Sequence, residues 1–283
     1  MLALSAALLL AGCTGPATTP TPSATSSPSA SASASPSPSS TEFMPEFVSL
    51  DFKDESDAIW TEVTNTDVTI DVYAWQDYAL AAQTYLREAD LGSMAEEEWN
   101  GELIIDFPVN SESFEYLTDK SAEVYQAATP CGPHEAIVVN PLMFQANEAT
   151  IMPMLVHEGV HFITHSACFQ PGPQWITEGF AEMITAEVLP EVADEDATAL
   201  RKFLRDCPIP TTLPPDSGIN CGSAFDGTVL AKVAVETILE ELGREKGIAA
   251  LQAAASTTEP DPADIEQWTT WYVETLESAK NQS

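Results

Sequence analysis

Two histidines and a glutamate form the pattern His-Glu-x-x-His between His157 and His161. On an α-helix, residues four positions apart lie on one face, one turn above each other, so both imidazoles can reach a single ion. Glu158 lies about 100° around the helix axis from His157, where its carboxylate could take a proton from a water on that ion. Zn²⁺ is the expected metal, because it accepts neutral imidazoles and leaves a position for water. The pattern predicts a zinc site if the chain supplies a third ligand.

A second acidic segment offers that ligand. The stretch Trp175–Glu182 resembles the W-x-x-E-G-x-A element of gluzincins, the thermolysin-like and aminopeptidase-like branch of zinc peptidases. The resemblance implies that Glu178 is the third ligand, with sixteen residues between it and His161. It also implies that Glu182, one helical turn later, accepts a hydrogen bond from a ligand imidazole and fixes its tautomer. A metzincin is excluded, because Ala167 stands where that family has its third histidine.

The gluzincin resemblance also implies an activity. It predicts a Zn²⁺-dependent hydrolase of peptides or proteins in which Glu158 is the general base. It predicts that the strand Ala136–Val139 is an edge strand that pairs with an extended substrate. In gluzincins a tyrosine or histidine helps to stabilise the oxyanion, and Tyr272 and His165 are the candidates here. His165 equally suits the C-terminus of a helix. Cleavage at chain ends and internal cleavage both remain open.

Two other functions fit parts of the pattern. A catalytically silent surface lipoprotein could use a gluzincin-like fold for binding or cell-wall interaction, but it would not need Glu158. A zinc-storage module would be rich in histidine, whereas this chain has only four. One of the four, His134, is expected in a loop and exposed to solvent. The hydrolase is therefore the leading hypothesis.

The expected secondary structure changes type along the chain. Apolar patterning predicts strands at 67–73, 103–109 and 136–139. Apolar residues at helical spacing predict helices at 75–91, 111–128, 147–166, 173–189, 194–205, 225–242, 246–256 and 262–278. The last helix is expected to present a core face of Trp268, Trp271, Tyr272 and Leu276. Together these elements predict an α+β fold, with a small mixed sheet first, then the zinc-binding helices and an all-helical C-terminal part.

The cysteines indicate an oxidising environment. Apart from Cys13, the chain has an even number of them, Cys131, Cys168, Cys207 and Cys221, as expected for disulfides in an exported domain. Three pairings are possible, and we favour Cys131 with Cys168 and Cys207 with Cys221. A structural metal site is not expected from these residues, because no Cys-x-x-Cys pair is present.

The first 42 residues differ in composition from the rest. An apolar run at 2–11 is too short to span a bilayer but suits the core of an export signal. It leads into Leu-Ala-Gly-Cys, which resembles a bacterial lipobox and implies cleavage before Cys13 and lipidation of that cysteine. Residues 14–41 are almost entirely Ser, Thr, Pro and Ala, as in an unfolded tether. The expected divisions are a signal peptide at 1–12, a lipidated tether at 13–42 and a metallopeptidase-like domain at 43–283. The expected location is the extracytoplasmic face of the cell membrane, with secretion without lipid as the alternative.

The overall charge restricts the partners. With 10 Lys and Arg against 44 Asp and Glu, the formal net charge is −34. A surface with this charge repels phosphate groups, so nucleic acid is not an expected partner. The apolar share of 44% is ordinary for a globular protein. The acidity therefore indicates a solvated surface around a normal core.

Overall fold

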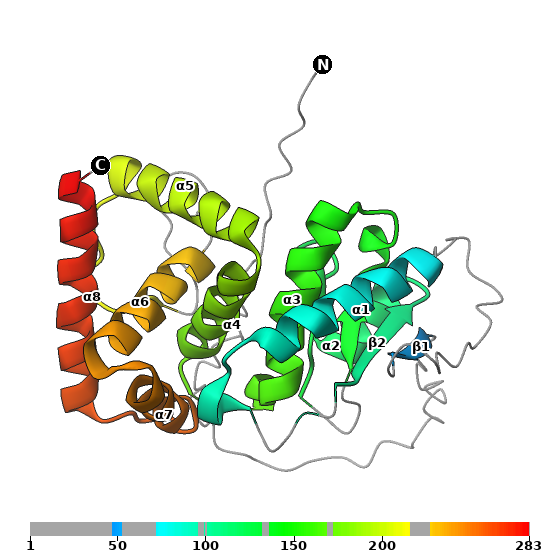
Figure 1. Cartoon of the computed structure of the whole chain (residues 1–283), viewed down its shortest axis with the longest axis horizontal. Coiled ribbons are helices and arrows are strands. Elements are labelled where there is room, and N and C mark those ends of the chain that lie inside the picture. The colour runs from blue at the N-terminus through cyan, green and yellow to red at the C-terminus, as the bar shows by residue number, and fades with distance from the viewer. Residues whose placement is uncertain are drawn as a thin grey trace, which may run out of the picture.

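The computed structural model describes residues 47–52, 72–95, 99, 101–131, 136–168, 172–215 and 227–282. Figure 1 shows two groups of elements side by side: a sheet with α1 (Val72–Glu88), α2 (Ser111–Thr118) and α3 (Glu148–Thr164), and a group formed by α4 to α8. This arrangement confirms the α+β prediction. The predicted signal peptide, Cys13 and the tether lie outside the described residues. Within the described part of the chain, no helix has both the length and the apolar character needed to cross a membrane.

The sheet has four strands in the order β1-β2-β4-β3. β1 (Phe47–Phe52) pairs antiparallel with β2 (Leu103–Pro108), β2 pairs parallel with β4 (Ile137–Val139), and β4 pairs antiparallel with β3 (Ala127–Ala128). All three residues of β4 are buried, as expected for an inner strand whose apolar residues do not alternate with polar ones. The sequence prediction does not include β1. The strand predicted at 67–73 lies mostly outside the described residues, and its last two residues begin α1.

The edge of the sheet differs from the prediction. Ala136–Val139 was expected to leave one side free for a substrate, but β3 pairs with that side. The register places Ala127 opposite Val139 and Ala128 opposite Val138. The prediction of an edge strand at 136–139 is therefore wrong, and β3 is the outer strand on that side.

β3 can form because α2 ends at Thr118, well before the end of the predicted helix. A helix was expected over 111–128, but it stops at Thr118, where Asp119 has a left-handed backbone with φ 55°. The side-chain amide of Asn140 then donates hydrogen bonds to the carbonyl oxygens of Ala122 and Tyr125, at 2.7 and 2.6 Å. These bonds hold the returning chain beside β4, so the residues after α2 join the sheet instead of extending the helix.

Helix α3 lies at the centre of the molecule. The side chain of Asn147 caps its first turn by accepting a hydrogen bond from the backbone N–H of Thr150. Every residue from Ile151 to His161 is buried, which is typical of a helix covered on all sides. The helix ends where His165 adopts φ 48°. Because His165 leaves the helix there, it does not continue the face that carries His157 and His161.

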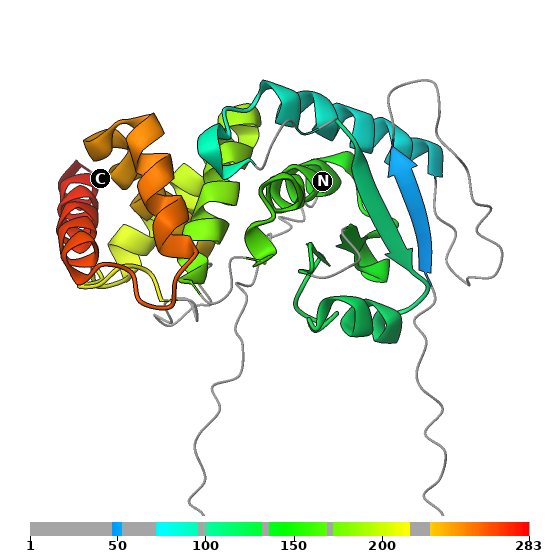
Figure 2. The same cartoon turned by 90° about the horizontal axis from the view of Figure 1, so that it is seen from below.

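The second half of the chain is helical, as predicted. It comprises α4 (Gln174–Val188), α5 (Pro190–Asp206), α6 (Gly227–Leu242), α7 (Arg244–Ala255) and α8 (Pro262–Gln282). The predicted core face of α8 is confirmed for Trp268, Tyr272 and Leu276, which are buried, whereas Trp271 is half-buried and packs against the same core. One hydrophobic core includes residues of both the sheet and these helices. Figure 2 shows α4 beside α6, on the side of the helical group that faces α3.

The disulfide prediction is confirmed for one pair. Cys131 and Cys168 are joined by a disulfide that links the segment after β3 to the short 3₁₀ turn after α3. Cys207 is also disulfide-bonded. Its predicted partner, Cys221, lies outside the described residues.

Candidate metal centre

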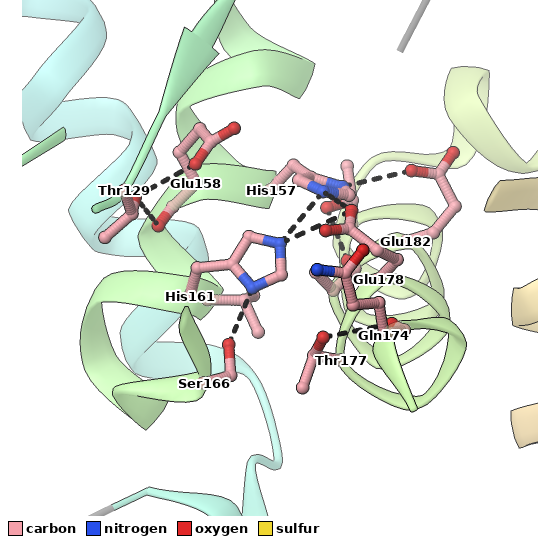
Figure 3. A network of polar contacts seen from close by, with 12 residues as sticks. Thr129, His157, Glu158, His161, Ser166, Gln174, Thr177, Glu178 and Glu182 are labelled. Carbon is pink, nitrogen blue, oxygen red and sulfur yellow. Dashed lines mark hydrogen bonds and ion pairs between the residues drawn. The ribbon is translucent and has the colours of Figure 1, made fainter. Parts of the chain in front are cut away.

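Three side chains from two helices converge on one point (Figure 3). His157 and His161 are on α3, and their Nε2 atoms are 3.2 Å apart. Glu178, on α4, places its Oε2 atom 3.4 Å from Nε2 of His157 and 3.6 Å from Nε2 of His161. One donor atom from each residue lies within 4.8 Å of the others. His157, His161 and Glu178 therefore form a group that could hold a metal ion.

The electrostatics of this group agree with cation binding. Burial alone would lower the pKa of His157, but hydrogen bonds and charges from Glu178 and Glu182 raise that pKa well above its ordinary value. Burial would raise the pKa of Glu178, but the two histidines hold that pKa well below its usual range. The carboxylates of Glu178 and Glu182 thus favour a positive partner at this group of side chains.

Glu182 contacts the far nitrogen of His157. Its Oε2 atom is 3.1 Å from Nδ1, and both residues are buried. When Nδ1 carries the hydrogen and donates it to Glu182, Nε2 is left with a free lone pair toward the ligand group. The structure thus places Glu182 where the gluzincin resemblance expects a carboxylate that orients the imidazole.

Ser166 plays the corresponding part for His161, and sequence reasoning missed it. Its Oγ atom is 2.6 Å from Nδ1 of His161. The chain brings Ser166 there because the left-handed conformation of His165 turns it back toward the end of α3. No spacing rule predicts such a contact, because it depends on where the helix stops.

Glu158, the expected base, is held by a second residue that the sequence did not reveal. Thr129 lies just after β3, and its hydroxyl contacts Glu158 twice, at 2.9 Å from Oε2 and 3.1 Å from the backbone carbonyl oxygen. Figure 3 shows the Glu158 carboxylate turned toward Thr129. Glu158 is only 7% exposed, so its orientation depends on this hydrogen bond more than on solvent.

The disulfide lies close in sequence to both of these hydroxyl groups. Thr129 precedes Cys131 by two residues, and Ser166 precedes Cys168 by two residues. The Cys131–Cys168 bond therefore ties together the segments that orient the base and the second histidine. Such a crosslink restricts the relative motion of two short segments outside the α-helices.

The other candidate residues are not part of the ligand group. Tyr272 is fully buried in the hydrophobic core on α8, where burial raises the pKa of its hydroxyl. His165 caps α3 instead of extending the ligand face. His134 lies outside the described residues. Gln174, one turn before Glu178 on α4, was not predicted, yet Figure 3 shows its amide between Glu178 and His161.

The donor set fits zinc. Two imidazole nitrogens and one carboxylate oxygen form the three-ligand set of many catalytic zinc sites, in which the fourth position is left to water or substrate. The Nδ1 atoms of both histidines already contact oxygen acceptors, as is usual for metal-binding imidazoles.

Comparisons with known proteins give no relative from which a function could be transferred. No family model, no curated protein and no solved structure matches the chain.

Proposed function

We propose that the protein is a zinc-dependent peptidase of the gluzincin type. The observation that carries the proposal is the convergence of His157, His161 and Glu178, whose donor atoms lie within 4.8 Å of one another. The Trp175–Glu182 segment supports it, because the carboxylates that the resemblance names as ligand and orienting group both contact the imidazole of His157. The likeness to gluzincins rests on these two motifs and on the α+β order of the elements.

Each residue of the proposed site would have a separate chemical role. A zinc ion held by the three ligands supplies Lewis acidity toward the scissile carbonyl and lowers the pKa of a water molecule. Glu158 would take a proton from that water and later deliver it to the leaving amine. Thr129 would hold the carboxylate of Glu158 in one orientation through the hydrogen bond from its hydroxyl group.

The ligand set can be tested by separating metal binding from turnover. We expect His157→Ala, His161→Ala and Glu178→Ala each to lose zinc, because a two-ligand site binds the metal orders of magnitude more weakly. Glu158→Gln should retain zinc and lose cleavage of casein or a peptide library. Zinc content by atomic spectroscopy and chelator-sensitive cleavage measure the two effects. Retention of zinc by Glu178→Ala would contradict the gluzincin assignment, and zinc binding without any cleavage would favour the silent lipoprotein.

We also propose that the peptidase domain is held at the extracytoplasmic face of the membrane. The support is the lipobox-like string that ends at Cys13 and the Ser/Thr/Pro/Ala tether after it. The disulfide between Cys131 and Cys168 agrees with an oxidising compartment. When expressed with the native leader, the protein should partition into detergent, and Cys13→Ser should abolish this partitioning. Equal partitioning of both forms after cleavage of the leader would contradict lipidation.

A further inference from the structure

Behind His157, a line of buried polar side chains crosses four helices. Glu182 on α4 contacts the imidazole of His157 on α3, and its carboxyl group also lies close enough to that of Asp196 on α5 for a hydrogen bond between them. Asp196 in turn accepts a hydrogen bond from the ammonium group of Lys232 on α6, at 2.8 Å. Glu182, Asp196 and Lys232 are 5%, 6% and 8% exposed. We call these residues the polar chain.

Burying a carboxyl or ammonium group costs free energy unless a partner compensates for the lost hydration. Two ionised carboxyl groups in hydrogen-bond contact repel each other, so a proton on Asp196 stabilises the contact. Burial and the neighbouring Glu182 raise the pKa of Asp196 to about 7, so Asp196 can take up a proton near neutral pH. Asp196 can then donate to Glu182 with one oxygen while its other oxygen accepts from Lys232.

Close packing of two helices makes this arrangement possible. A Cβ at Gly179 would collide with the carbonyl group of Ala231, so the backbones of α4 and α6 touch there. The next residue of α6 after Ala231 is Lys232, and Glu182 lies three residues after Gly179 on α4. The close contact at Gly179 thus places Lys232 beside α4, near enough to Glu182 for their charges to interact.

We propose that Asp196 and Lys232 are positioning residues of the metal centre: Lys232 orients Asp196, Asp196 orients Glu182, and Glu182 orients the imidazole of His157. This inference rests on the proposed function, in which His157 is a zinc ligand. It extends the site beyond the residues of the two sequence motifs and joins α5 and α6 to metal binding.

The direction in which zinc affinity changes distinguishes a positioning role from a purely electrostatic one. Removal of a cation near a metal site strengthens cation binding if only Coulomb forces act. Removal of a positioning group weakens it, because the imidazole and its carboxylate then lose a defined orientation. The same change therefore gives opposite results under the two explanations.

The test compares the zinc affinity of four full-length proteins by competition with a fluorescent chelator. The double variant Asp196→Ala/Lys232→Met removes the polar chain without leaving a buried ammonium group unpaired, and we expect its affinity to fall about tenfold. Asp196→Asn can still donate to Glu182 and accept from Lys232, so its affinity should stay within about threefold of wild type. Thermal unfolding of the metal-free proteins measures stability separately.

Arg244→Met is the matched control. Arg244 on α7 also ties α4 to a neighbouring helix, through two hydrogen bonds to Glu187 at 2.6 and 2.9 Å, and it contacts no ligand. The control should be less stable than wild type but should bind zinc equally well. Affinity at or above the wild-type level in the double variant would overturn the proposal. So would an equal loss in Asp196→Asn or in the control. Failure of the wild-type protein to bind zinc would overturn the proposed function, and with it this inference.

Discussion

The metal centre lies between two regions that hold their residues by different means. On the sheet side of α3, short segments outside the α-helices supply single hydroxyl groups, Thr129 to the base and Ser166 to His161. A disulfide joins these two segments. On the helical side, Glu178 and Glu182 are carried by a buried helix whose backbone touches α6. There, charged side chains, and not a covalent bond, connect one helix to the next.

The difference follows from the backbone. A helix holds its own side chains in register through its internal hydrogen bonds, so it needs only correct packing against its neighbours. Short segments outside helices have few such bonds and are the least rigid parts of a fold. The sheet side therefore depends on a crosslink for the order that the helical side obtains from packing.

Loss of the disulfide should have the largest effect, and it tests whether the sheet side depends on this crosslink. The variant Cys131→Ala/Cys168→Ala frees a loop with a sequence separation of 37 residues. Its free energy of unfolding should fall by about 4 kcal/mol, because the unfolded chain gains entropy. Denaturant unfolding of the metal-free protein measures the loss. An unchanged unfolding free energy would mean that packing alone holds the sheet side.

Substitution of two glycines tests how helix packing differs between the two sides. A Cβ at Gly179 would meet the backbone of Ala231, whereas a Cβ at Gly159 would meet the flexible end of Leu86. Gly179→Ala should therefore lower the free energy of unfolding by about 2 kcal/mol, since α4 and α6 must separate. Gly159→Ala should stay within about 1 kcal/mol of wild type, because alanine favours the helix and Leu86 can move. Equal effects in thermal unfolding would contradict the rigid contact between α4 and α6.

The smallest effects are expected from removal of the two hydroxyl groups on the sheet side, and the two removals should change different quantities. Thr129→Val should lower turnover about tenfold and leave zinc affinity unchanged, because the Thr129 hydroxyl is hydrogen-bonded to the base. Ser166→Ala should weaken zinc binding about tenfold, because His161 loses the partner of its Nδ1 atom. Chelator competition and peptide cleavage measure the two quantities. Faster turnover in Thr129→Val would mean that this hydrogen bond restrains Glu158 instead of preparing it.

Much of the fold could be predicted because its signals are local. The helices of the second half follow apolar spacing, which depends only on the periodicity of one segment. The same local reasoning fails at 111–128, where Asn140, a distant residue, holds the returning chain in the sheet. It also fails at β1, because this strand pairs with β2, which lies far from it in the sequence.

The residues that could bind a metal were identifiable from the sequence, because the His-Glu-x-x-His spacing sets two imidazoles on one face and the motif after it contains Glu178 and Glu182. The residues that support them were found in the three-dimensional structure. Thr129, Ser166, Asp196 and Lys232 come from four separate segments and share no spacing with the motifs. Helical periodicity relates residues within one turn or two, whereas the partners of a buried polar group are chosen by whichever helix, strand end or turn packs against it.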